Sequence, residues 1–415
     1  MKCSQPTTSN KLPPGAVTAA KKPKEMRAIV LVLAVGALFM YADRTVLYPM
    51  LQIIAQEHSL SGAATGFISS TYFLLYVLVQ VPAGLLGDRL GLKKVLVVSY
   101  LLGGTALLLL GLVKSYAMLI VLVGLHGIGM GAFYPMSYGI NIGTVPKSRR
   151  GLASATINAG MSVGTALGLV FAGPIYLQTN NWRLPFLIAA VPTLMMPFCF
   201  HRYLPKPVAT AVSEAQADNK QQFNLRNILA DKELWALNLA VFCAGYGFWV
   251  ALTWGPEFFA SERALGLAAG GVFTALPALS AIPAALGAGQ LSDLLGRRRL
   301  ALILYPLQAA SIFSLAYVQS LPILVVALIL YGLVGRTVSD AIIISWFGDQ
   351  IAEKNPDALG TAVCVFNLVG MSSAVIAPLI SGLIKDITGS LVGAFYFGAA
   401  MVLIGTVCAA MAKEG

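Results

Sequence analysis

Charged residues are scarce in this chain, and their scarcity argues against a soluble globular protein. Aspartate, glutamate, lysine and arginine make up 11% of the 415 residues, whereas 57% are hydrophobic. The mean hydropathy is +0.78. Because an ordinary soluble domain carries about a quarter charged residues, this composition indicates a protein embedded in a lipid bilayer.

Metal-binding and catalytic patterns are missing as well. The three histidines, His58, His126 and His201, are far apart, and none of the five cysteines has metal-ligand spacing. No nucleophile stands beside a base in a recognisable motif. We therefore expect no metal site, no cofactor and no enzymatic activity.

The net charge of +11 could indicate a nucleic-acid-binding protein. The lysines and arginines, however, lie in short loops between apolar segments rather than on one face. Basic loops of this kind are typical of a membrane surface. We therefore expect the lipid bilayer as a partner, and no nucleic acid.

Apolar segments long enough to cross a bilayer dominate the chain, since a spanning helix needs about 20 residues. They predict an all-α membrane protein with twelve transmembrane helices. The predicted spans are 28–50, 63–86, 92–113, 116–142, 152–176, 183–204, 234–256, 266–292, 299–318, 321–346, 358–384 and 390–412.

Two polar stretches mark the domain organisation. Residues 1–26 are rich in proline, serine, threonine and lysine, and we expect a disordered cytoplasmic tail there. Residues 205–233 are polar and charged, and we expect a cytoplasmic linker between two halves. The predicted domains are therefore six-helix bundles at 27–204 and 234–415.

The basic residues also predict the orientation, because cytoplasmic loops are enriched in lysine and arginine. With a cytoplasmic N-terminus, the external loops contain only Lys114, Arg183, Arg263 and Lys385, and every other basic loop residue faces the cytoplasm. We expect a multi-pass protein of the cell membrane (inner or plasma), with both termini in the cytoplasm.

A glycine-punctuated basic turn occurs twice in the chain. Residues 84–94 read G-L-L-G-D-R-L-G-L-K-K, and residues 289–299 repeat the glycine, aspartate and basic positions 205 residues later. Glycines let two helices turn sharply and approach closely. The repeat indicates a duplicated chain with two related halves.

We expect these turns to form a conformational gate. Asp88 and Asp293 would each lie against the positive N-terminus of a helix in the opposite half and hold the cytoplasmic face shut. The alternative is a simple topology determinant. The predicted gate residues are Gly84, Asp88, Arg89, Gly91, Lys93, Lys94, Asp293, Arg297 and Arg298.

The pattern G-x-x-x-D-R-x-G-x-K-K between the second and third spans resembles the signature of the major facilitator superfamily. A degenerate second copy between helices eight and nine is usual in that superfamily, and the resemblance covers residues 27–412. It implies a secondary transporter with two pseudo-symmetric six-helix bundles, one central site and rocking alternating access.

Ionisable side chains inside membrane spans are costly and are therefore candidates for function. Here they are Asp43, Arg44, His126, Arg336 and Asp340. Adjacent helix positions point about 100° apart, so Arg44 is expected to face a central cavity as an anion site rather than pair with Asp43. For Arg336 the alternatives are a local pair with Asp340 and a cavity role, and for His126 they are helix packing and proton transfer.

Three of these residues, Asp43, His126 and Asp340, are the candidates for proton coupling. We favour Asp43, because burial disfavours the charged form of a carboxyl group. Other polar or aromatic residues could line a cavity with the two arginines, although each alone is more often a packing residue. These are Tyr76, Tyr134, Asn158, Trp249 and Asn367.

Residues 41–44, Y-A-D-R, resemble the D-R signature of the anion:cation symporter family. Phe133-Tyr134-Pro135 and Asn181-Trp182-Arg183 are further matches. Two positions depart from the family pattern, since Val123 stands where many members have arginine and Met130 where they have an acidic residue. The resemblance implies symport of a small organic anion, such as a carboxylate, with protons.

Two rival functions remain open. A drug/proton antiporter of the same fold is one, but Gly173-Pro174 continues as Ile-Tyr-Leu, so the exporter signature G-P-x-x-G-G is incomplete. A non-transporting membrane sensor is the other, and it is disfavoured because no signalling domain is evident. We expect a monomer.

Overall fold

The computed structural model describes residues 23–205, 231–354 and 359–412. Within these ranges the chain forms twelve helical segments long and apolar enough to cross a membrane, as predicted. Helices suit this setting because they satisfy every backbone hydrogen bond within one segment. Residues 1–22 of the predicted tail and most of the predicted linker lie outside the described residues, whereas residues 23–26, predicted as the end of the tail, form the first turn of α1.

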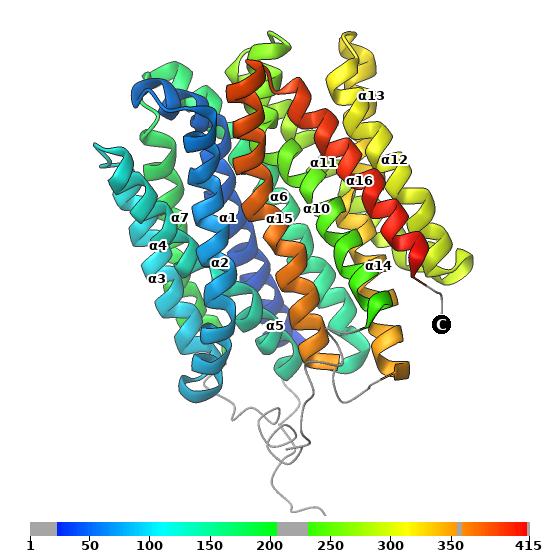
Figure 1. The fold of residues 1–415 in the computed structure, drawn as a ribbon. Coiled ribbons are helices and arrows are strands. Elements are labelled where there is room, and N and C mark those ends of the chain that lie inside the picture. The colour runs from blue at the N-terminus through cyan, green and yellow to red at the C-terminus, as the bar shows by residue number, and fades with distance from the viewer. Residues whose placement is uncertain (1–22, 206–230, 355–358, 413–415) are drawn as a thin grey trace, which may run out of the picture.

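The helices form two groups, one from each half of the chain (Figure 1). The first contains α1 (Pro23–Glu57), α2 (Gly62–Leu90), α3 (Leu92–Leu110), α4 (Tyr116–Gly131), α5 (Phe133–Thr144), α6 (Lys147–Thr179) and α7 (Leu184–Tyr203). The second contains α10 (Lys232–Glu257), the short π-helix η1 (Phe258–Glu262), α11 (Leu267–Leu295), α12 (Arg297–Tyr317), α13 (Leu321–Val334), α14 (Arg336–Lys354), α15 (Leu359–Thr388) and α16 (Val392–Met411). The two groups meet along α2 with α15 and along α6 with α11.

The fourth and tenth spans were predicted as continuous helices, and both are broken. The fourth divides into α4 and α5 at Ala132, three residues before Pro135, and the tenth divides into α13 and α14 at Gly335. Proline has no N–H to donate, and glycine tolerates non-helical backbone. The breaks occupy corresponding places in the two halves, and the second one starts α14 at Arg336.

The repeated turns adopt the same backbone conformation. Gly91 joins α2 to α3 with φ 90° and ψ 133°, and Gly296 joins α11 to α12 with φ 83° and ψ 144°. A positive φ of this size is readily available only to glycine. The sequence repeat is therefore also a structural repeat.

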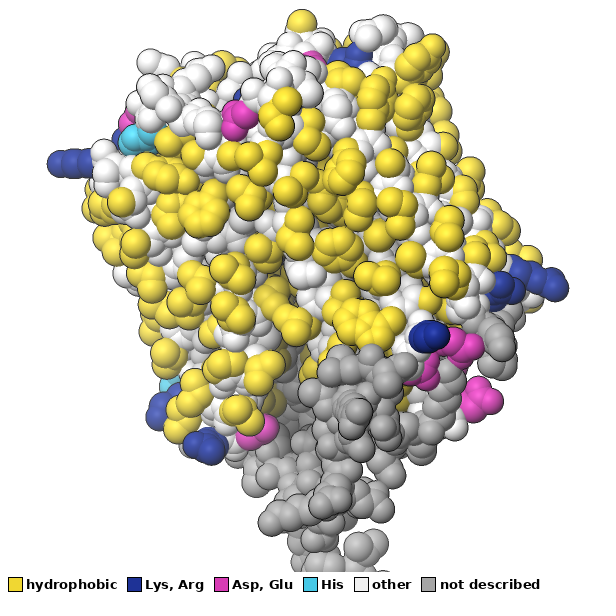
Figure 2. All heavy atoms as spheres, in the orientation of Figure 1, with side chains coloured by type: hydrophobic (Ala, Val, Ile, Leu, Met, Phe, Trp, Pro, Cys, Tyr) yellow, Lys and Arg dark blue, Asp and Glu magenta, His cyan; other side chains and the backbone are white. Residues whose placement is uncertain are grey.

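Apolar side chains cover the flank of the molecule, and charged ones gather towards its two ends (Figure 2). We call the end with Gly91 and Gly296 the motif end, and the opposite end, with residues 58–61 and 258–266, the far end. Both ends of the described chain lie at the motif end. The chain starts there with α1, and its twelve spans, an even number, bring it back to the same end.

Close packing of α6 on α1 fixes the orientation of α1. Gly160, Gly164 and Gly168 recur every four residues on α6 and face α1. A Cβ atom at Gly164 would lie only 2.0 Å from the backbone oxygen of Leu38, so this approach requires glycine. Small residues at such spacing allow helices to pack closely in membranes. The rotation of α1 about its axis, and hence the direction of Arg44, is held by this contact.

Candidate functional site

A cavity of about 790 Å³ lies between the two halves. Helices α1, α2, α5 and α6 contribute to its wall from the first half, and α10, α11, α13, α14 and α15 from the second. All seven residues predicted to contact substrate line it, together with Asp340: Arg44, Tyr76, Tyr134, Asn158, Trp249, Arg336 and Asn367.

Arg44 faces this cavity from α1 and is 5% exposed. Its guanidinium carbon lies 4.0 Å from the centre of the Tyr41 ring, one helical turn earlier. It forms no ion pair or hydrogen bond with any described residue, and its Nε is buried without a partner. The internal pair with Asp43, the alternative that the sequence disfavoured, is therefore not formed, and the positive charge of Arg44 is left uncompensated.

Both alternatives considered for Arg336 are present in the structure, since it pairs with Asp340 and also lines the cavity. Arg336 Nε donates to Asp340 Oδ2 at 2.7 Å, and both side chains line the cavity. The pair joins successive turns of α14, as four-residue spacing requires. Arg336 Nη1 and Asp340 Oδ1 are buried without a hydrogen-bond partner. The pair therefore leaves part of its hydrogen-bonding capacity unused.

Trp249 of α10 lies within reach of both arginines. The guanidinium carbon of Arg44 is 5.5 Å from its ring centre, and that of Arg336 is 5.4 Å. Phe73 of α2 packs on the same indole, with ring centres 4.4 Å apart. Cation–π contacts stabilise a cation near an aromatic face. One positive charge from each half thus converges on a single ring.

Asp43 and His126 lie away from the cavity. Asp43 is buried and accepts a hydrogen bond from the hydroxyl of Thr193 on α7 at 2.6 Å. His126 Nδ1 lies 2.9 Å from the backbone oxygen of Gly103. Neither is among the lining residues. Their roles in proton coupling stay predictions, and for His126 these contacts match the helix-packing alternative.

Several cavity residues escaped the sequence analysis, and three of them are polar or aromatic residues close to the predicted ones. Tyr41 lines the wall beside Arg44, and its place three residues earlier on the same helix could have indicated this. Gln80 accepts a hydrogen bond from Asn367 Nδ2 across the two halves at 3.0 Å, and an amide within an apolar span was the available signal. Tyr331 sits in a long apolar run that gave no such signal.

At the motif end, basic residues of the repeated turns bind helix C-termini within their own half. Lys93 Nζ donates to the backbone oxygens of His201 and Leu204 at 2.7 and 2.8 Å, at the end of α7. Arg298, 205 residues later, donates to Ala410 at 2.8 Å, near the end of α16. Cations stabilise the negative end of a helix. These two contacts repeat the internal symmetry of the sequence.

The two aspartates of the predicted latch show no such contact. Asp88 is exposed and forms no hydrogen bond with any described residue. The side chain of Asp293, and residues 355–358 before the eleventh span, lie outside the described part. Arg297 forms an ion pair with Asp349 of α14, also within one half. The latch function of these residues stays a prediction.

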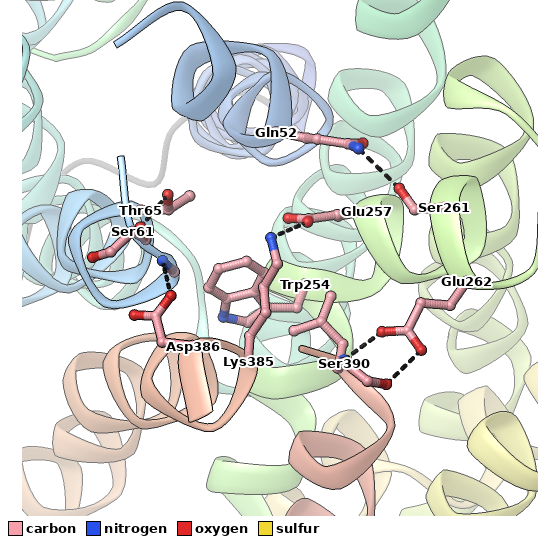
Figure 3. Close-up of polar contacts among 12 residues, drawn as sticks. Gln52, Ser61, Thr65, Trp254, Glu257, Ser261, Glu262, Lys385, Asp386 and Ser390 are labelled. Atoms are coloured by element: carbon pink, nitrogen blue, oxygen red, sulfur yellow. Dashed lines mark hydrogen bonds and ion pairs between the residues drawn. The ribbon is translucent and has the colours of Figure 1, made fainter. Parts of the chain in front are cut away.

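Polar contacts join the two halves at the far end instead (Figure 3). Asp386 of α15 accepts hydrogen bonds from the backbone N–H groups of Gly62 and Ala63, at the start of α2. Gln52 of α1 donates to Ser261 of η1 at 2.9 Å. Described residues of opposite halves thus hold each other at the far end, whereas nearer the motif end they meet in the Asn367–Gln80 hydrogen bond.

A buried ion pair lies beside these contacts. Glu257 is 6% exposed and binds Lys385, whose ammonium lies 5.5 Å from the ring centre of Trp254. Helix packing there is also tight, since a Cβ at Gly271 would lie 2.1 Å from the backbone oxygen of Leu169. The cavity wall instead extends towards the motif end, where it includes Leu152, 73% exposed.

Comparison with known proteins agrees with this architecture. The model of the Major Facilitator Superfamily matches residues 33–378. A bacterial homologue of the human lysosomal transporter Spinster, solved in an inward-facing and occupied conformation, superposes with a TM-score of 0.75. The match has 16% sequence identity and covers 94% of this chain and 96% of the other. At that identity the likeness shows the fold alone.

Several curated proteins are similar in sequence. A probable sulfoacetate transporter of Cupriavidus necator is 27% identical over 62% of this chain and 63% of its own length. The voltage-gated purine nucleotide uniporter of Mus musculus is 26% identical over 92% of this chain and 88% of its own length. A probable galactarate/D-glucarate transporter of Bacillus subtilis is 24% identical, covering 92% and 90%. With twelve spans in two related halves and a family match over most of its length, the chain belongs to the Major Facilitator Superfamily and is a membrane transporter, not an enzyme.

Proposed function

We propose that this protein is a secondary active transporter that moves a small organic anion, a carboxylate, through the cavity by alternating access and together with protons. The observation that carries the proposal is Arg44, a buried guanidinium that faces the cavity without an ionic partner among the described residues. Burying an unpaired charge costs several kcal/mol. An anion bound in the cavity would offset that cost.

The charged residues of the cavity wall also favour a negatively charged substrate. Among the described lining residues there are two arginines and one carboxylate, that of Asp340. The remaining wall is largely aromatic and aliphatic, with Asn158, Asn367 and Gln80 as polar contacts. Such a wall suits an anionic group carried on a small organic body, because pockets fix ligands with a few polar groups in an apolar surround.

The substrates named for the relatives support an anionic substrate as well. Sulfoacetate, glucarate and purine nucleotides, named for three of them, are all organic anions. Arginine binds carboxylates with two parallel hydrogen bonds, which lysine cannot do. We place the anion contact at Arg44, with Arg336 as the second basic group.

We further propose a monomer in the cell membrane with the motif end in the cytoplasm, as the positive-inside rule predicts. In that orientation the far-end contacts close the external side, and this conformation faces inward. The gate residues of the repeated turns would then engage in the opposite, outward-facing conformation. This assignment explains why Asp88 is free to solvent in the structure.

Transport assays with purified protein in liposomes test the proposal. Uptake of labelled sulfoacetate, D-glucarate and ATP is measured under an imposed pH gradient and, separately, under a potassium diffusion potential. We expect a carboxylate to accumulate when the outside is acidic, and we expect Arg44→Ala to abolish this uptake. Empty liposomes provide the background rate.

Other outcomes identify the rival functions. Export of a lipophilic cation in exchange for protons, without transport of any acid, would support the drug/proton antiporter. Accumulation that follows the diffusion potential but not the pH gradient would replace proton symport by electrically driven uniport. If well-folded protein transports none of these compounds, the remaining hypothesis is a non-transporting membrane sensor.

A further inference from the structure

The carboxylate of Asp340 binds Arg336 on the wall of the central cavity. The two side chains share one hydrogen bond, at 2.7 Å, and both line the central cavity. Arg336 Nη1 remains buried without a partner, so the guanidinium can still form hydrogen bonds. A carboxylate entering the cavity would meet a cation that an internal carboxylate already partly neutralises.

No other charged side chain competes for this pair among the described residues. The titratable groups within electrostatic reach of Asp340 or Arg336 are Tyr305 of α12, Tyr331 of α13 and Tyr134 of α5, and Cys243 of α10 and Cys408 of α16 lie beyond them, near Tyr305. Tyrosines and cysteines are ordinarily neutral at pH 7. Helices α11 and α15 present no titratable side chain to the described cavity wall. Arg336 is therefore the charged group that Asp340 contacts directly, and Arg44 is the other cation of the cavity wall.

Resting on the proposed function, we infer that the Arg336–Asp340 pair is the site where proton binding and anion binding are coupled. A proton taken up by a carboxylate oxygen of Asp340 neutralises it and weakens its hold on Arg336. The guanidinium then binds the carboxylate of the substrate. After the substrate leaves, Asp340 releases its proton to water and the ion pair forms again.

This arrangement would also limit uncoupled movement of protons. With the pair intact, the empty carrier has two arginines and one carboxylate in the cavity, and a carrier with both proton and anion has the same net charge there. A carrier with the proton alone would bury an unpaired guanidinium, which is strongly unfavourable. The two favourable states are those that symport of an anion with a proton requires.

The placement of Asp340 distinguishes it from Asp43, the residue favoured from the sequence. Asp43 accepts a hydrogen bond from Thr193 and is absent from the cavity wall. Asp340 contacts a cavity arginine directly. The carboxylate that a substrate can displace is therefore Asp340.

Asp340→Asn tests this coupling, because asparagine keeps the size and the hydrogen-bond acceptor but cannot ionise. In wild-type protein, substrate affinity should fall by up to about tenfold per pH unit as Asp340 ionises. In Asp340→Asn, affinity should be independent of pH between about 5 and 8. The variant should still exchange labelled for unlabelled substrate but should not accumulate it under a pH gradient. Glu353→Gln, on an exposed position of the same helix, should behave like wild type.

Calorimetry of the wild-type protein gives an independent readout that needs no variant. Titration of substrate in buffers of different ionisation enthalpy should show close to one proton taken up per anion bound at a pH where Asp340 is ionised. No proton uptake, or an unaltered pH dependence in folded Asp340→Asn, would overturn the inference. If wild-type protein carries no organic anion at all, the proposed function has failed instead.

Discussion

Asp386, about two turns beyond Pro378 on α15, holds the first residue of α2 through a hydrogen bond from the backbone N–H of Gly62 at 2.5 Å. A second bond, from Ala63, is 2.8 Å long. The two partners come from opposite halves of the chain and are 324 residues apart. A carboxylate is favoured at a helix N-terminus because it satisfies free N–H groups and lies at the positive end of the helix dipole.

Asp386→Ala should weaken the far-end closure without weakening the fold of either half. Loss of a carboxylate cap typically costs about 1 kcal/mol, which is a roughly fivefold change in the ratio of two conformations. Distances between spin labels at the exposed far-end positions Lys114 and Gln319 would report the change, with a larger separated population expected in the variant.

Glu262→Ala is the matched control for Asp386→Ala. Glu262 binds Ser390 and Leu391, so its contacts lie entirely within the second half. Its loss should leave the distribution of label distances unchanged. Equal effects of the two substitutions would show that Asp386 does not hold the halves together specifically.

Gly271→Ala should separate α11 from α6 at the far end. The added Cβ would lie 2.1 Å from the backbone oxygen of Leu169 in the other half, and backbone atoms cannot yield as side chains do. Overpacking of this kind costs about 1–3 kcal/mol. The same spin labels should report a shift away from the far-end-closed conformation. Gly348→Ala, where the methyl would meet nothing within 4 Å, should produce no shift.

Arg44 should contribute most of the binding energy of the anion. Losing one partner of a buried, charge-assisted contact costs about 2–5 kcal/mol, or on the order of 30-fold to several thousand-fold in affinity. We expect Arg44→Ala to nearly abolish binding measured by calorimetry, and Arg44→Lys to weaken it substantially because lysine lacks the planar fork. Normal binding by Arg44→Ala would move the anion site to Arg336.

Asp43→Asn separates the two carboxylates proposed for coupling. If Asp340 carries the proton, the Asp43→Asn protein should still accumulate substrate under a pH gradient. Its stability should change by about 1 kcal/mol or less, because asparagine can still accept the hydrogen bond from Thr193. Loss of accumulation with exchange retained would return the coupling role to Asp43, as the sequence analysis favoured.

The contacts at the far end could not be derived from the sequence, and neither could the packing inside the first half. Asp386 and Gly62 have no pattern that links them, because their contact depends on how two separately folded halves meet. The burial of Glu257 against Lys385 depends in the same way on tertiary packing, since these residues of α10 and α15 are 128 positions apart in the sequence. The breaks at Ala132 and Gly335 were also missed, since the apolar runs continue across them.

The sequence by itself determined the twelve spans, the duplication and the two arginines and two asparagines of the cavity wall. It could do so because a bilayer penalises every polar group that does not meet a polar partner or a cavity, so an intramembrane arginine or asparagine marks such a place. Only the tertiary structure decided which neighbour faces which way. Asp43 and Arg44 are adjacent, yet close packing of α6 on α1 turns Arg44 to the cavity and Asp43 to Thr193, because side chains one residue apart on a helix point in different directions.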